Sequence, residues 1–92
     1  MTRPLRFAAI RLDHRHIYHL VGELMAAGAQ CAGYCPQTSD PRVLEGFRER
    51  FPGLPAIDRS VLFEDRGIDI VVSAAIPRDR AGIAIRAMLT GK

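Results

Sequence analysis

The stretch LRFAAIRLDHRHIYHLVGELMAAG, residues 5–28, decides the fold. Its apolar opening, 5–12, predicts a β-strand, and its polar middle predicts a tight turn. Apolar side chains then recur at helical spacing and predict a helix over 14–27 that ends at Gly28; they are Ile17, Leu20, Val21, Leu24 and Met25. A strand that passes through a short turn into an amphipathic helix is typical of a parallel α/β sheet.

The rest of the chain repeats this alternation. Strands are expected over 29–35, 55–57 and 68–74, and helices over 41–51, 60–66 and 78–90. Asp40 and Pro41 predict an N-cap followed by proline at the first helical position. With right-handed crossovers, the expected fold is α/β, with a Rossmann-like parallel sheet of four strands in the order 3-2-1-4 and helices on both faces.

The expected sheet has an open edge beside its last strand. An unpaired edge of this kind is a template for pairing with other chains. It therefore indicates either that the chain is part of a longer protein or that a partner covers the edge, as in a homo-oligomer.

The composition is that of one small globular domain. The 92 residues are 48% hydrophobic and 25% charged, with a net charge of +3. The thirteen Lys and Arg are scattered and accompany no aromatic stacking motif, which argues against nucleic acid as a partner. No apolar run approaches the roughly 20 residues of a membrane span, and none has the form of an export signal. A cytoplasmic protein is expected.

The two cysteines favour the same compartment. Cys31, Gly33 and Cys35 are expected to share one face of the second strand. The Cα atoms of the cysteines would then lie about 13 Å apart, too far for a disulfide. Cys35 is either a reactive thiol or, as is commoner, a small apolar packing residue.

Two segments carry a family resemblance. An apolar strand over 70–76 leads to Pro77, and the segment AMLTGK, residues 87–92, matches the closing A-L-x-x-G-K of a helix. With His19 after the first turn, these features resemble the N-terminal domain of the glucose–fructose oxidoreductase, inositol dehydrogenase and MocA-like (Gfo/Idh/MocA) family. The resemblance covers nearly the whole chain.

The resemblance implies NAD or NADP as cofactor and hydride transfer to or from a sugar, polyol or related alcohol. It also implies that residues 1–92 form a single dinucleotide-binding domain. The family's catalytic Lys and its substrate domain lie beyond the matched segment, so this chain is not expected to catalyse the reaction alone.

The phosphate-binding motif departs from the family. The three glycines of G-x-G-x-x-G are replaced by Arg11, Asp13 and His16. The first glycine normally permits a tight turn and the second lets the pyrophosphate approach the backbone. Here Arg11 places a side chain in the turn, and the Asp13 carboxylate would repel phosphate. The acid that holds the ribose of NAD falls at Cys35, which weakens NAD specificity.

Candidate cofactor-binding residues lie at the carboxyl ends of the expected strands, where open α/β sheets bind ligands. They are Arg11, Leu12, Asp13, His14, Arg15 and His16 after the first strand, Cys35 and Thr38 after the second, and Ala74, Ala75, Ile76 and Pro77 after the last. Among the residues after the second strand, three side chains hint at a 2′-phosphate and hence at NADP: Thr38, Ser39 and Arg42.

The polar turn itself has three interpretations. It binds phosphate at a helix N-terminus, it is an ordinary helix start with Asp13 as N-cap, or it begins a metal site from its histidines. Two functions therefore stay open: a cofactor-binding domain of an oxidoreductase, or a degenerate Rossmann module that serves as an interaction or dimerisation domain.

Overall fold

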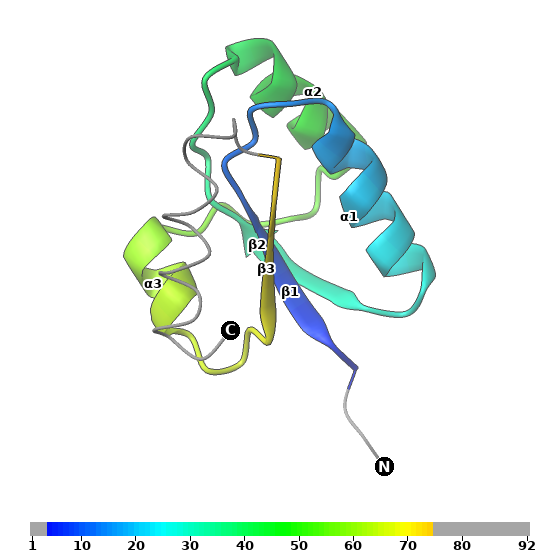
Figure 1. The fold of residues 1–92 in the computed structure, drawn as a ribbon, viewed down its shortest axis with the longest axis vertical. Coiled ribbons are helices and arrows are strands. Elements are labelled where there is room, and N and C mark those ends of the chain that lie inside the picture. Colours follow the sequence, from blue (N-terminus) through cyan, green and yellow to red (C-terminus); the bar gives the residue numbers. More distant parts are fainter. Residues whose placement is uncertain (1–3, 75–92) are drawn as a thin grey trace.

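Three parallel strands form the centre of the structure, a computed structural model that describes residues 4–74. Strand β1 (Arg6–Ile10) lies between β2 (Gln30–Tyr34) and β3 (Ile70–Ser73). Helices α1 (His16–Ala26) and α2 (Pro41–Arg50) cover one face of the sheet, and α3 (Arg59–Glu64) covers the other (Figure 1). The expected α/β class and parallel pairing are confirmed. The expected final helix, 78–90, lies outside the described residues.

The expected sheet of four strands in the order 3-2-1-4 is confirmed in part: the described residues form three strands, in the order β2-β1-β3. The segment 55–57, expected as a strand, forms only an isolated parallel bridge between Ala56 and Tyr34. The Tyr34 amide donates to the Pro55 carbonyl at 3.0 Å, and the Ile57 amide donates to the Tyr34 carbonyl at 2.7 Å. Because proline has no amide proton, Pro55 cannot extend this ladder backwards.

Strand β1 is buried on both faces, as expected of the central strand of a parallel sheet. Phe7 and Ala9 pack in one core with α1 and α2, whereas Ala8 and Ile10 pack in a second core with α3. All four side chains are fully buried. The first core also contains Leu12, Ile17, Val21, Tyr34, Val43, Phe47 and Ala74; the second also contains Cys35, Leu62, Phe63 and Ile68.

A bulge in β2 changes which of its residues share a face. Phe7 pairs with Cys31 but Ala8 pairs with Gly33, so Ala32 is the additional residue. The two cysteines therefore lie on opposite faces, Cys31 against the α1/α2 core and Cys35 in the α3 core. The expectation that they share a face is wrong, because strict alternation fails at a bulge. Both are free thiols, as expected.

Helix α2 begins where the sequence predicts. Asp40 is its N-cap and accepts a hydrogen bond from the Arg42 amide at 3.0 Å, and Pro41 follows at the first helical position. That backbone hydrogen bond, aided by the Arg42 guanidinium, holds the pKa of the Asp40 carboxyl below its usual value. By contrast, α3 begins at Arg59, one residue before the predicted Ser60, and its N-cap Asp58 makes no side-chain cap.

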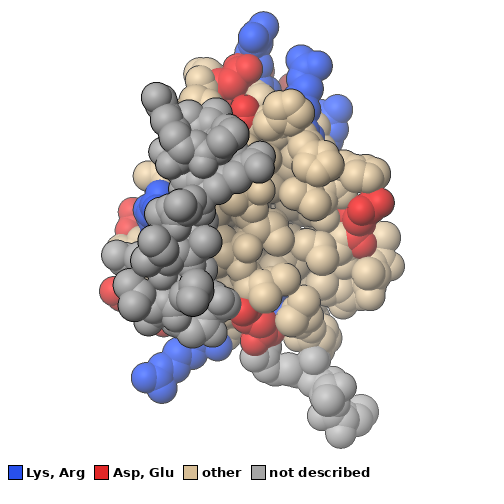
Figure 2. All heavy atoms as spheres, in the orientation of Figure 1, with Lys and Arg blue, Asp and Glu red and all other residues tan. Residues whose placement is uncertain are grey.

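The outer surface is charged at the end where the strands terminate. In Figure 2, Arg side chains project at the upper end of the visible face, where Figure 1 places α2 and the β1–α1 loop. The centre of that face carries uncharged residues. Within residues 4–74, no helix has the length and apolar character that a bilayer crossing requires.

Candidate functional site at the carboxyl ends of β1 and β2

Two loops meet where β1 and β2 end. The Cys35 amide donates to the Ala9 carbonyl at 2.8 Å, and the Leu12 amide donates to the Gln37 carbonyl at 2.9 Å. The Thr38 hydroxyl donates to the Leu12 carbonyl. These bonds hold the β1–α1 loop, 11–15, against the β2–α2 loop, 35–40. Thr38, which is predicted to bind the cofactor, thus links the two loops.

Arg11 has the backbone conformation of a glycine. Its φ of 54° lies in the left-handed region that side chains disfavour. This is the position of the first glycine in the motif that the turn resembles, so the tight turn persists although the glycine is absent. The Arg11 Nε donates to the Asp13 Oδ2 at 3.1 Å, which folds the side chain back over the turn.

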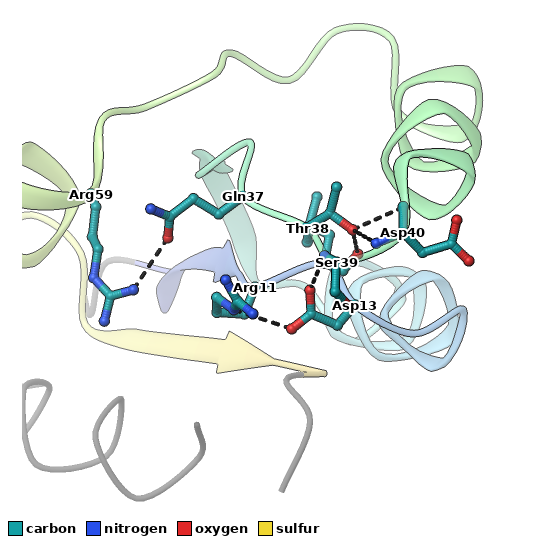
Figure 3. A network of polar contacts seen from close by, with 8 residues as sticks. Arg11, Asp13, Gln37, Thr38, Ser39, Asp40 and Arg59 are labelled. Atoms are coloured by element: carbon teal, nitrogen blue, oxygen red, sulfur yellow. Dashed lines mark hydrogen bonds and ion pairs between the residues drawn. The ribbon is translucent and has the colours of Figure 1, made fainter. Parts of the chain in front are cut away.

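Asp13 connects the two loops. Its carboxylate is fully buried, and its Oδ1 accepts a hydrogen bond from the Ser39 amide at 2.6 Å (Figure 3). The interpretation of Asp13 as the N-cap of α1 is therefore wrong, because the side chain faces the neighbouring loop rather than the helix. Its negative charge is compensated by Arg11.

The backbone amides at the start of α1 donate hydrogen bonds to residues just before the helix. The N-cap is Arg15, which makes no side-chain cap. The His16 amide donates to the His14 Nδ1 at 3.0 Å, and the Ile17 amide donates to the His14 carbonyl at 3.1 Å. An incoming phosphate at this helix end would have to displace the imidazole of His14.

The histidines do not assemble into a metal site within residues 4–74, where no group of three His, Cys, Asp or Glu is placed to hold an ion. The rings of His16 and His19 lie 6.2 Å apart. His19 Nε2 instead lies 3.0 Å from the Glu23 Oε1 on the exposed side of α1. The metal interpretation gains no support from this part of the chain.

A cavity of about 320 Å³ opens at the carboxyl end of β2. It lies between the residues that follow β2 and the segment that precedes and begins α3. Its lining residues are Cys35, Pro36, Gln37, Ala56, Ile57, Asp58 and Arg59. The volume falls at the lower end of the range for small-molecule pockets.

The pocket combines a buried thiol with a cation. Burial raises the pKa of the Cys35 thiol, although the positive charge of Arg59 opposes the shift. Cys35 is therefore a neutral thiol at neutral pH, which favours packing over reactivity. The Arg59 Nη1 donates to the Gln37 Oε1 at 3.2 Å, so these side chains meet across the loops (Figure 3).

Several of the residues predicted to bind the cofactor lie at this end of the sheet. Arg11, Leu12 and Asp13 meet the β2–α2 loop as described, and Cys35 lines the pocket. His14 and Arg15 are exposed, and Ala74 is buried in the α1/α2 core after β3. Ala75, Ile76 and Pro77 lie outside the described residues.

Sequence reasoning missed Gln37 and Arg59. The rule that ligands bind at carboxyl ends of strands could have found Arg59, because it follows the segment 55–57 that was expected to be a strand.

The strain at Arg11 can be measured by comparing two substitutions. Arg11→Gly is expected to exceed Arg11→Ala in free energy of unfolding by about 1 kcal/mol, because only the alanine retains a Cβ at positive φ. Both variants lack the guanidinium, so its bond to Asp13 cancels in the comparison. Urea denaturation of the two proteins gives the difference; equal stabilities would contradict a left-handed residue at position 11.

The chain is similar to a protein of known structure, although no family model is matched. No protein-family model matches the chain, and no curated protein matches it. A crystal structure from Erwinia carotovora atroseptica SCRI1043, described as a "putative oxidoreductase", is 42% identical with a TM-score of 0.85. The alignment covers 96% of this chain and 26% of the Erwinia chain, so this chain spans about a quarter of that protein's length.

Proposed function

We propose that the chain is the nucleotide-binding part of an NAD(P)-dependent oxidoreductase of the Gfo/Idh/MocA type. It holds the adenosine half of the cofactor, and the rest of such an enzyme supplies the substrate site and the catalytic Lys. By family resemblance, the hydride passes to or from a sugar, polyol or related alcohol. The likeness to the Erwinia protein, over nearly the whole of this chain, supports the oxidoreductase class.

The position of the pocket carries the proposal. It lies at the carboxyl end of β2, directly after the strand whose end receives the adenosine ribose in dinucleotide-binding sheets. Pro36 and Ile57 offer apolar surface to a base, and Gln37 offers an amide that can donate to or accept from ribose hydroxyls. These residues fit a nucleoside in size and in chemistry.

The pyrophosphate would then lie over the β1–α1 turn. Arg15 is exposed there, at the N-cap of α1. The Asp13 carboxylate is buried against Arg11 and the Ser39 amide, so it does not face an anion that approaches from solvent. This arrangement reduces the repulsion between the Asp13 carboxylate and the pyrophosphate that the sequence alone suggests.

A calorimetric titration with NAD(H) and NADP(H) tests the proposal, with Ala56→Trp as the blocking variant. Ala56 is exposed and lines the pocket, and the hydrogen bonds of Tyr34 go to its neighbours, Pro55 and Ile57. The larger side chain is expected to fill the cavity and weaken binding at least about tenfold, or 1.4 kcal/mol.

The matched control is Val61→Trp, which adds an indole to an exposed position of α3 outside the pocket. This variant is expected to bind the cofactor with the same affinity as the unmodified chain. Absence of saturable binding at about 1 mM cofactor, or equal binding by the Ala56 variant, would contradict the proposal.

Two observations favour the second function, an interaction module without cofactor. The amides of Ser39 and His16 already have acceptors within the chain, namely Asp13 and His14. In addition, β3 has one strand neighbour among the described residues. If the titration shows no binding while sedimentation shows a concentration-dependent dimer, this second function replaces the first.

A further inference from the structure

The residues that directly follow β2 do not include the acidic group that usually selects NAD. An acidic side chain at the end of the second strand normally accepts hydrogen bonds from the ribose hydroxyls. Here the lining residues after β2 are Cys35, Pro36 and Gln37, none of which carries a negative charge at neutral pH. The acid in the pocket lining, Asp58, does not follow β2 but precedes α3, where its Oδ2 accepts a hydrogen bond from the Ser60 hydroxyl at 2.7 Å.

Arg59 provides a cation at the same place. Its Nη1 donates to Gln37 Oε1 at 3.2 Å, and its guanidinium lies 5.5 Å from the centre of the Phe63 ring. It forms no ion pair within residues 4–74, and both of its contacts are to uncharged side chains. Gln37 and Phe63 therefore position the guanidinium without neutralising it.

The other candidates for binding a phosphate are already engaged. The Thr38 hydroxyl bonds to the carbonyls of Leu12 and Asp40. The Arg42 Nε lies 3.4 Å from the Asp40 Oδ1, and the Arg42 side chain is 83% exposed. Neither residue lines the pocket. Arg59 is thus the described side chain whose charge and position suit an anion bound beside the nucleoside.

We propose that Arg59, held by Gln37, recognises the 2′-phosphate of NADP(H) and so makes this pocket selective for NADP(H) over NAD(H). The inference rests on the proposed function, because it assigns the cofactor of the same site. A planar guanidinium can donate two parallel hydrogen bonds to a phosphate. The 2′-hydroxyl of NAD carries no negative charge that would attract the guanidinium.

Calorimetric titration of four ligands tests this proposal: NADPH, NADH, 2′,5′-ADP and 3′,5′-ADP. The unmodified chain is expected to bind NADPH at least about tenfold more tightly than NADH, and to prefer the 2′-phosphate isomer of ADP. Inorganic phosphate at the same concentration should not compete, which separates a nucleotide site from a general anion site.

Arg59→Gln should remove the preference, lowering the affinity for NADPH at least about tenfold while that for NADH stays unchanged. Arg66→Gln, at an exposed position outside the pocket, removes the same charge and should change neither affinity. Circular dichroism confirms that each variant is folded.

Three results would overturn the inference: equal or tighter binding of NADH by the unmodified chain, parallel loss of both cofactors in Arg59→Gln, or effective competition by inorganic phosphate. The first result leaves a cofactor site in place and refutes only the selectivity. Absence of binding by all four ligands would refute the proposed function together with this inference.

Discussion

Gly33→Ala is expected to lower the free energy of unfolding by about 3 kcal/mol. A Cβ at this position would lie 2.5 Å from the Pro55 carbonyl oxygen and 2.6 Å from the Ile57 Cδ1. The φ of +152° adds backbone strain for any residue with a side chain. Relief of the overlap would push the segment 55–57 away from β2 and break its hydrogen bonds to Tyr34.

Urea denaturation measures this effect, and Gly22→Ala is the matched control. Gly22 lies within α1, and a Cβ there meets nothing within 4 Å. Because alanine favours helix, that control is expected to be more stable by up to about 1 kcal/mol. A Gly33 variant as stable as the unmodified chain would show that the segment 55–57 does not pack against β2 as described. Because Ile57 lines the pocket, the same variant should also bind the cofactor more weakly.

Asp13→Ala is expected to lower the free energy of unfolding by about 2 kcal/mol, the scale of a hydrogen bond to a charged group. The substitution removes the acceptor of the Ser39 amide and the partner of Arg11 together. The hydrogen bonds of Cys35, Leu12 and Thr38 between the two segments would remain.

Asp13→Asn separates the two contributions. The amide oxygen of asparagine can still accept from Ser39, whereas its charge no longer attracts Arg11. The expected loss is about half that of the alanine variant. Thermal unfolding of both variants at one pH gives the comparison; an asparagine variant as unstable as the alanine variant would assign the whole effect to the Arg11 pair.

The sequence predicted the fold because its signals are local and repeated. Apolar periodicity, together with capping and terminating residues, placed all three helices of the described region, and the apolar runs placed β1, β2 and β3. The segment 55–57 failed as a strand because Pro55 cannot donate to a ladder. The bulge at Ala32 depends on pairing with β1, a long-range property that spacing within β2 does not record.

The site was less predictable, for a physical reason. The hydrogen-bond partners of turn residues can lie far away in sequence. Asp13 accepts a hydrogen bond from the Ser39 amide and does not cap the start of α1. Arg59 meets Gln37 because the start of α3 lies beside the loop that follows β2. By contrast, Arg11 has the positive φ that the first glycine of G-x-G-x-x-G would have, although it is not a glycine. The turn geometry that the resemblance implied is thus present without its glycine.

The most direct test of the account is amide chemical-shift mapping by NMR as NADPH is added to the ¹⁵N-labelled chain. Saturable shifts are expected, concentrated at Cys35, Gln37 and the residues 56–59 that line the pocket. The exposed outer face of α2, around Glu45 and Glu49, should remain unchanged. Shifts absent from the pocket residues, or no shift at about 1 mM NADPH, would contradict an adenosine site at the carboxyl end of β2.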